Sequence, residues 1–112
     1  MAKPIDERII RKRKETRGEI LMVLDQNGAI DRPIIVKWIE SAMRARPELA
    51  AEVPAQIPYL KGKGYIEVVE QDDTPELMPV RSAYIRLTPA GQDVVEGTVE
   101  DPGIIFGDAD RA

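Results

Sequence analysis

Apolar residues recur at helical spacing in the first segment of the chain, residues 6–28, but only toward its end. The run at 20–24 is wholly apolar and is followed by an Asn-Gly stop signal. If one counts back from Leu24 in steps of three or four residues, the first position reached is apolar and the next two are basic. The step after those reaches Ile10. The pattern predicts one long helix whose second half is core and whose basic first half lies along or beyond the domain surface.

A second helix is predicted over residues 32–45. Asp31 fits its N-cap, and Pro33 fits the first turn, where a missing N–H is tolerated. The apolar face of this helix would hold Ile35, Ile39 and Ala42 or Met43. Trp38, the only tryptophan, falls near this face on the helical wheel. Because large aromatic residues tend to be buried, we expect Trp38 in the core or at its edge.

A third helix is predicted from one apolar stripe at steps of four, four and three. The stripe consists of Leu49, Val53, Ile57 and Leu60. A proline inside a helix removes a hydrogen bond and clashes with the preceding turn, at a cost of about 3 kcal/mol. We therefore expect the helix to begin near Pro54 or to kink at Pro58. Gly62 or Gly64 can supply its left-handed C-cap.

Two β-rich segments follow, at 65–70 and 82–87, and each alternates apolar and polar residues in part. The acidic, proline-bearing segment between them is too long for a tight turn, so we predict a hairpin with an extended loop. Thr88 is predicted to cap a short last helix, with Pro89 in its first turn. Gly91 would let that helix pack closely on the domain.

The composition predicts one folded domain and excludes most catalytic chemistry. Of the 112 residues, 43% are hydrophobic and 32% are charged, which is ordinary for a soluble domain. The absence of cysteine and histidine excludes thiolate and imidazole metal sites, disulfides and histidine general bases. The sequence contains no apolar run of about 18 residues, so we expect no membrane span. It also has no apolar stretch behind the basic N-terminal cluster, so we expect no secretory signal and a cytoplasmic location.

The net charge of −4 hides a polarity along the chain. Residues 1–63 contain 13 Lys and Arg against 9 Asp and Glu, whereas residues 64–112 contain 3 against 11. The first half can meet a phosphate backbone, and the second half would be repelled by one. Six basic residues lie between positions 8 and 17, either as a phosphate-binding surface or as a solvated helix face offset in part by neighbouring acids.

Two short phrases at hairpin spacing carry a resemblance to a known family. They are Leu60-Lys61-Gly62-Lys63-Gly64-Tyr65-Ile66 and Leu87-Thr88-Pro89-Ala90-Gly91. With the predicted order of elements, residues 14–97 resemble the winged helix-turn-helix domains of MarR-like and PadR-like regulators. The resemblance implies an α+β fold with a three-helix core, a two-stranded β-hairpin wing and a short C-terminal helix. Residues 1–13 would then be a basic N-terminal extension of the first helix, and residues 98–112 an acidic C-terminal tail.

A narrower likeness lies near the end of the sequence. Two motifs carry it, Glu96-Gly97-Thr98 and Asp101-Pro102-Gly103-Ile104. Small winged-helix proteins of Mu-like transposable phages are similar in finishing with such motifs. The likeness implies a phage-borne or prophage-borne domain of DNA-binding type in a bacterial cell or an infected host. It supplies neither a target site nor a substrate.

The resemblance implies binding to double-stranded DNA, with the third helix in the major groove and the wing on phosphates. Backbone contacts are expected from Arg11, Lys12, Arg13, Lys14 and Arg17. The third helix and the wing would add Gln56, Tyr59, Lys61, Lys63 and Arg81. Because such domains commonly pair on two half-sites, a homodimer through the terminal segments and a role as a phage transcriptional regulator go with this hypothesis.

Two features favour a different use of the scaffold. On the predicted outer face of the third helix, only Gln56 has an amide suited to adenine. In the predicted wing, Asp72, Asp73 and Glu76 outnumber Arg81 and would repel phosphate. The alternative function is a protein-protein interaction module that has lost sequence-specific DNA reading.

The tail supplies the residues for such an interaction, Ile104, Ile105 and Phe106. Exposed, they would add to a sheet edge or dock in a groove of a protein partner. The open alternative is that they fold back on their own core or on a second copy of the chain.

Catalysis is not expected, and neither a cofactor nor a metal is implied. The pair Asp72-Asp73 lies in a predicted loop without a cleft, so nothing there separates the two pKa values as acid-base chemistry requires. Gly62 and Gly64 close a helix rather than open one, which is the wrong end for a phosphate.

Overall fold

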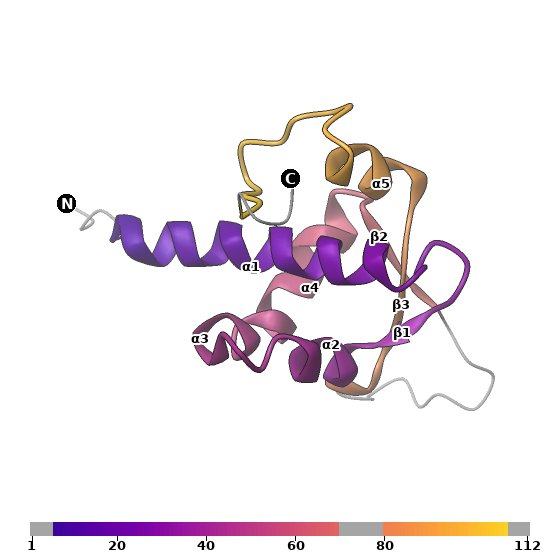
Figure 1. Ribbon diagram of the computed structural model, residues 1–112, viewed down its shortest axis with the longest axis horizontal. Helices are drawn as coiled ribbons and strands as arrows, with labels where there is room; N and C mark the ends of the chain where they lie inside the picture. Colours follow the sequence, from indigo (N-terminus) through magenta and orange to yellow (C-terminus); the bar gives the residue numbers. More distant parts are fainter. Residues whose placement is uncertain (1–5, 70–79, 108–112) are drawn as a thin grey trace.

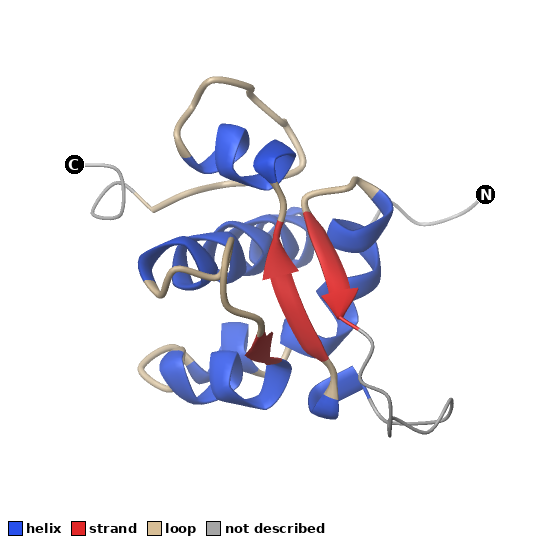
Figure 2. Cartoon of the chain, turned by 90° about the vertical axis from the view of Figure 1, so that its right-hand side faces the viewer, coloured by secondary structure: helices blue, strands red, loops and turns tan. Residues whose placement is uncertain are grey.

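The computed structural model describes residues 6–69 and 80–107. Within these ranges five helices, a short 3-10 turn and three strands follow one another (Figure 1). In chain order they are α1 (Glu7–Gln26), β1 (Ile34–Ile35), α2 (Val36–Ala42), α3 (Pro47–Ala50), α4 (Val53–Gly62), β2 (Ile66–Val69), η1 (Val80–Ser82), β3 (Tyr84–Leu87) and α5 (Pro89–Val95). The strands form one antiparallel sheet in the order β1-β3-β2, with the helices behind it in the view of Figure 2.

The predicted hairpin strands are present as β2 and β3. Their register places Ile66 opposite Leu87 and Val68 opposite Ile85. Ile66, Ile85 and Leu87 are buried, as the alternation indicated, because these side chains face the helices. Most of the loop between the two strands, residues 70–79, lies outside the described residues.

β1 is a strand that the sequence pattern did not predict. It pairs with β3, with Ile35 opposite Tyr84, and the N–H of Val36 donates to the carbonyl of Ala83 at 2.9 Å. This pairing keeps the backbone extended, so α2 begins at Val36. The predicted start at residue 32, with Asp31 as N-cap, is therefore wrong. A strand of two residues has no periodicity of its own and forms only because β3 is beside it.

Trp38 is 44% exposed, so the expectation that it belongs to the core is wrong. Because α2 begins at Val36, the side chains that it buries are those of Val36 and Ile39, with Met43 just beyond its end. Trp38 lies off this face. Of the two residues expected to close the apolar face, Met43 is buried and Ala42 is exposed.

The stripe predicted for the third helix is buried in full, but two helices share it. Its members are Leu49 in α3 and Val53, Ile57 and Leu60 in α4. Pro54 lies in the first turn of α4, where no N–H is needed, which confirms the predicted start of this helix. Pro58 lies inside α4. Gly64 takes the left-handed conformation, with a φ of 78°, just after α4 ends.

The two halves of α1 differ as the apolar pattern predicted. The run at 20–24 is buried, whereas the first turns of the helix are mostly exposed and extend past the rest of the molecule (Figure 1). Thr16 and Gly18 are also buried in its middle. Only the second half of α1 therefore contributes its apolar side chains to the core.

The junction between β3 and α5 has the predicted form. The Thr88 Oγ1 atom accepts a hydrogen bond from the N–H of Gly91 at 3.1 Å and donates one to the Gly64 carbonyl at 2.5 Å. A Cβ atom at Gly91 would collide with the carbonyl of Tyr65, so only glycine allows this close approach. The cap thereby fastens the start of α5 to the start of β2.

Candidate functional site

The side of α4 that faces solvent presents little that can read a base edge. Gln56, predicted to lie on that side, is only 5% exposed, and its Oε1 atom accepts a hydrogen bond from Arg17 Nε at 2.8 Å. Burial of the amide oxygen is tolerated because this bond satisfies it. The exposed residues of α4 are Ala55, Pro58, Lys61 and Gly62. A methyl group and a proline ring offer no hydrogen bond to a base, and the ammonium group of Lys61 is a point charge without the planar fork of Arg.

Arg17 is half-buried, and its guanidinium contacts other parts of the protein. Its guanidinium carbon lies 3.5 Å from the centroid of the Tyr59 ring, and its Nη1 donates to the carbonyl of Gly103 at 3.0 Å. Together with the bond to Gln56, these contacts join α1, α4 and the segment that follows α5. Arg17, Gln56 and Tyr59 were each predicted to contact DNA, and the structure brings the three together in a partly buried cluster in which Arg17 contacts the other two.

The segment at 101–106, which we call the latch, returns across α1 and α4. Asp101 anchors its start: one carboxylate oxygen accepts from the Tyr65 hydroxyl at 2.5 Å, and the other accepts from the Gly103 N–H at 2.7 Å. Lys63 Nζ lies 3.9 Å from the same carboxylate. The hydrogen bond from Tyr65 lowers the pKa of the Asp101 carboxyl and raises the pKa of the Tyr65 hydroxyl to about 12.

The rest of the latch packs against Gly18 and the core. Ile104 is 8% exposed and belongs to the hydrophobic core. The N–H of Ile105 donates to the carbonyl of Lys14 at 3.1 Å, and the Ile105 carbonyl lies where a Cβ of Gly18 would be. Phe106 is half-buried and packs against the core. Of the two alternatives for this apolar segment, the structure has it folded back on its own chain, and free exposure of Ile104 is ruled out.

The Asp-Pro-Gly-Ile motif, which carried the narrower likeness, begins the latch. The hydrogen bond that the Asp101 carboxylate accepts from the N–H two residues later defines an Asx turn, a local signal that such a motif can give. The partners of the turn, Tyr65 and Arg17, lie far away in the sequence and could not be inferred from it. The motif therefore has a structural role, which is to hold the latch on α1 and α4.

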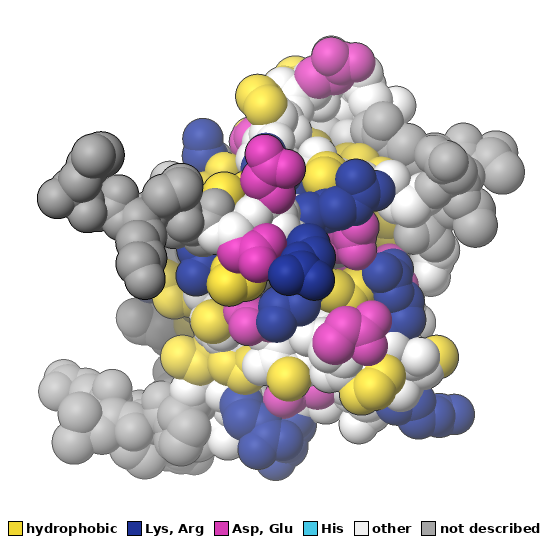
Figure 3. All heavy atoms as spheres, turned by 90° about the vertical axis from the view of Figure 1, so that its left-hand side faces the viewer, with side chains coloured by type: hydrophobic (Ala, Val, Ile, Leu, Met, Phe, Trp, Pro, Cys, Tyr) yellow, Lys and Arg dark blue, Asp and Glu magenta, His cyan; other side chains and the backbone are white. Residues whose placement is uncertain are grey.

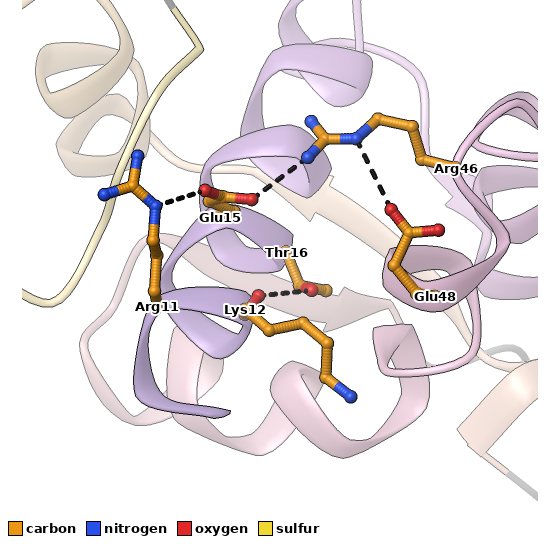
Figure 4. A network of polar contacts seen from close by, with 6 residues as sticks. All are labelled: Arg11, Lys12, Glu15, Thr16, Arg46 and Glu48. Carbon is orange, nitrogen blue, oxygen red and sulfur yellow. Dashed lines mark hydrogen bonds and ion pairs between the residues drawn. The ribbon is translucent and has the colours of Figure 1, made fainter. Parts of the chain in front are cut away.

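Acidic side chains interrupt the basic residues of α1. On the face of the molecule drawn in Figure 3, side chains of Lys and Arg alternate with those of Asp and Glu. Arg11 Nε lies 2.8 Å from Glu15 Oε1, and Lys12 Nζ lies 3.6 Å from Glu52 Oε1. Arg46 Nη2 lies 3.0 Å from the other oxygen of Glu15 (Figure 4). Ion pairs this exposed contribute about 0–1 kcal/mol each to the stability of the fold. Their main effect is therefore to reduce the net positive charge of this surface.

The other predicted DNA contacts are dispersed. Arg13 and Lys14 of α1, and Lys61 of α4, form no ion pair with any described side chain. Lys63 faces Asp101, as noted, and Arg81 Nε lies 2.8 Å from Glu40 Oε2. The predicted wing acids at 72, 73 and 76 lie outside the described residues. Within the described residues, acidic partners interrupt the predicted contact surface between α1 and α4, at Lys12 and at Lys63.

A second surface, which the sequence did not indicate, surrounds Trp38. The chain forms an open hollow of about 360 Å³ there, lined by Asn27, Arg32, Pro33, Ile34, Ile35, Trp38 and Tyr84. We call this the Trp38 surface. It combines the edge strand β1, the start of α2 and the first residue of β3. No local pattern signals it, because the exposure of Trp38 depends on the shift in the start of α2 that β1 imposes.

Comparisons with protein families, with curated proteins and with solved structures find no match for this chain. Among the described residues, no three acidic side chains gather into a group that could hold a metal ion. None of the described helices is both long enough and apolar enough to cross a membrane.

Proposed function

We propose that this chain is a protein-interaction module on a winged-helix scaffold. The order of α1, α2, α4, the β2-β3 hairpin and α5 supports the scaffold. The phrases that carried the resemblance also fall at the expected places: the one at 60–66 joins α4 to β2, and the one at 87–91 joins β3 to α5.

The observation that carries the proposal is the burial of Gln56, the one residue of α4 with a side-chain amide. Gln56 is buried and bonded to Arg17, and the exposed side of the helix presents Ala55 and Pro58. Reading a base pair requires donors and acceptors at the groove, and Lys61 alone gives only a point charge. If this α4 entered the major groove of DNA, it would therefore distinguish one base sequence from another only weakly.

The exposed aromatic residue supports protein contact instead. Trp, Tyr and Arg are the residues most enriched at the energetic centres of protein interfaces. Trp38, Tyr84 and Arg32 line one hollow on this chain. Exposure of such a group to water is unfavourable, so a partner that covers it gains affinity from the burial.

Selection from a random-peptide display library on the immobilised full chain tests this proposal. We expect a shared peptide motif to be enriched relative to selection on an unrelated domain of similar charge. Fluorescence anisotropy with a labelled duplex, at about 150 mM salt, should show no preference between unrelated sequences. Enrichment of no motif, together with a strong preference for one duplex sequence, would overturn the proposal.

A second candidate function is duplex DNA binding through phosphates, as a phage or prophage regulator that pairs on DNA. The specific observation in its favour is that Arg13, Lys14 and Lys61 have no acidic partner among the described side chains. Each phosphate contact contributes about one unit to the slope of log affinity against log salt.

Replacement of Arg13 and Lys14 together by Gln should therefore lower that slope by about two units. The charge-matched control is Arg32→Gln with Lys37→Gln, which removes the same charge from the neighbourhood of Trp38. Equal losses in the two double variants would mean that the affinity is diffuse and not located on α1. No binding to long duplex at about 50 mM salt would exclude this function.

A further inference from the structure

We infer that the Trp38 surface binds an extended peptide segment in which apolar side chains are accompanied by carboxylates. This inference rests on the proposed function and specifies its surface and its partner. The hollow is at the lower end of the range of about 300–1,000 Å³ that binding pockets occupy. Its size suits a few side chains of a short segment rather than a folded domain.

The floor of the hollow is apolar and its aromatic groups have unused donors. Ile34 and Ile35 line it together with the rings of Trp38 and Tyr84. Neither the Trp38 indole N–H nor the Tyr84 hydroxyl makes a hydrogen bond to any described residue. Tyr and Trp at interfaces typically bury the ring while the polar tip bonds to the partner. An occupant that covers the rings must therefore also bring acceptors.

The charge that lines the hollow is positive, although exposed Asp31 precedes Arg32 in the sequence. Among the described residues, Arg32 is the one charged side chain that lines it, and none of the lining residues carries a carboxylate. Lys37 is exposed on α2 next to Trp38 in the sequence. Neither cation forms an ion pair with a described acid. Carboxylates, like phosphates, satisfy a guanidinium with two parallel hydrogen bonds, so charge complementarity selects an acidic partner.

Asn27 adds one acceptor at the edge of this site. Its Nδ2 donates to the Val23 carbonyl at 2.7 Å, which fixes the orientation of the amide. Its Oδ1 accepts no hydrogen bond from a described residue. A backbone N–H of an extended peptide can bond to this oxygen, and the apolar side chains on alternate positions can then reach the floor.

Two other occupants fit less well. In a two-fold dimer through this surface the patch would meet itself, bringing Arg32 and Lys37 of one copy against the same cations of the other, and like charges repel. A phosphate backbone would find two cations beside an apolar floor, and phosphates gain nothing from Ile34 or Ile35. An acidic apolar peptide is the occupant that uses both the floor and the charge.

The single tryptophan reports on occupancy in the full chain. The probe is a short capped peptide in which Leu and Phe alternate with Glu, and the matched control peptide has Lys in place of Glu. We expect a saturable blue shift of Trp38 emission with the Glu peptide and at least tenfold weaker binding of the Lys peptide. Arg32→Gln should weaken the Glu peptide about tenfold. Arg44→Gln, which removes an exposed Arg that does not line the hollow, should leave its affinity unchanged.

Three results would overturn the inference, and they differ in what they imply for the proposed function. Equal binding of the Glu peptide and the Lys peptide would show that charge does not select the occupant. Unchanged affinity of display-selected peptides for Trp38→Ala and Arg32→Gln would place the interaction on another surface and leave the proposed function standing. A concentration-dependent blue shift without peptide, with a doubled mass in sedimentation, would make a second copy the occupant.

Discussion

The Arg17 guanidinium lies over the ring of Tyr59 and at the same time bonds to the buried amide of Gln56. A cation held against an aromatic face gains about 0.5–2 kcal/mol, and a buried amide that loses its partner costs about 1–3 kcal/mol. One side chain of α1 thus stabilises α4 in two ways. The third contact, to the Gly103 carbonyl, extends the same role to the latch.

Arg17→Ala should lower the free energy of unfolding by about 2–4 kcal/mol, because it leaves Gln56 buried without its donor and removes the cation from Tyr59. Urea unfolding followed by circular dichroism measures this change. Arg13→Ala is the matched control on the same helix and should stay within about 0.5 kcal/mol of the parent. Equal effects of the two substitutions would contradict the role given to Arg17.

The latch should weaken at both extremes of pH. Asp101 has a folded pKa below the ordinary value of 3.8, so its contribution is complete above that value and is lost as pH falls through the lower folded pKa. Tyr65 has a folded pKa raised from 10.0 to about 12, so its contribution is complete below pH 10.0 and is lost as pH rises to about 12.

Asp101→Asn and Tyr65→Phe each remove the hydrogen bond between these two residues. Each should therefore make the urea midpoint depend less on pH, both below pH 3.8 and between pH 10.0 and about 12. Glu100→Gln removes the same charge from an exposed neighbour and separates loss of the hydrogen bond from loss of charge. A parent profile whose slopes in acid and alkali persist in both latch variants would show that other groups cause them.

The close approach of the latch to α1 should make Gly18 intolerant of any side chain. A Cβ at Gly18 would meet the Ile105 carbonyl, which is backbone and cannot turn aside. Gly18→Ala should therefore cost about 1–3 kcal/mol, although alanine favours helices. Gly62→Ala, in α4 with open space around it, should be neutral or stabilising. Faster hydrogen exchange at the Ile105 amide in Gly18→Ala alone would locate the damage in the latch.

The exposure of Trp38 predicts a small cost for its removal. Trp38→Ala should destabilise the fold by about 1.5 kcal/mol or less, whereas Ile39→Ala, at the next position and fully buried, should cost about 2–5 kcal/mol. Thermal and urea unfolding of the pair give the comparison. A larger loss at Trp38 than at Ile39 would mean that the tryptophan belongs to the core after all.

Local signals were sufficient for some of these features and not for others. The apolar stripe of α4 and the Thr88 cap depend on neighbours within a few positions, and both are correct. β1 depends on β3, about 50 residues later, which no periodicity within two residues can report. Gln56 was placed on the outside because its donor, Arg17, lies 39 positions away. The wrong start predicted for α2 and the wrong burial predicted for Trp38 both follow from the failure to predict β1.

The bond from Arg17 to Gly103 spans 86 positions and encloses most of the chain in one loop. Closing so long a loop is slow compared with forming α1 or the hairpin, and the contact cannot form until residue 103 has been synthesised. A nascent chain that has reached only α5 would expose the apolar surface on which Ile104 packs. We therefore expect co-translational folding to pause at that length, with the native state reached once the latch has left the ribosome.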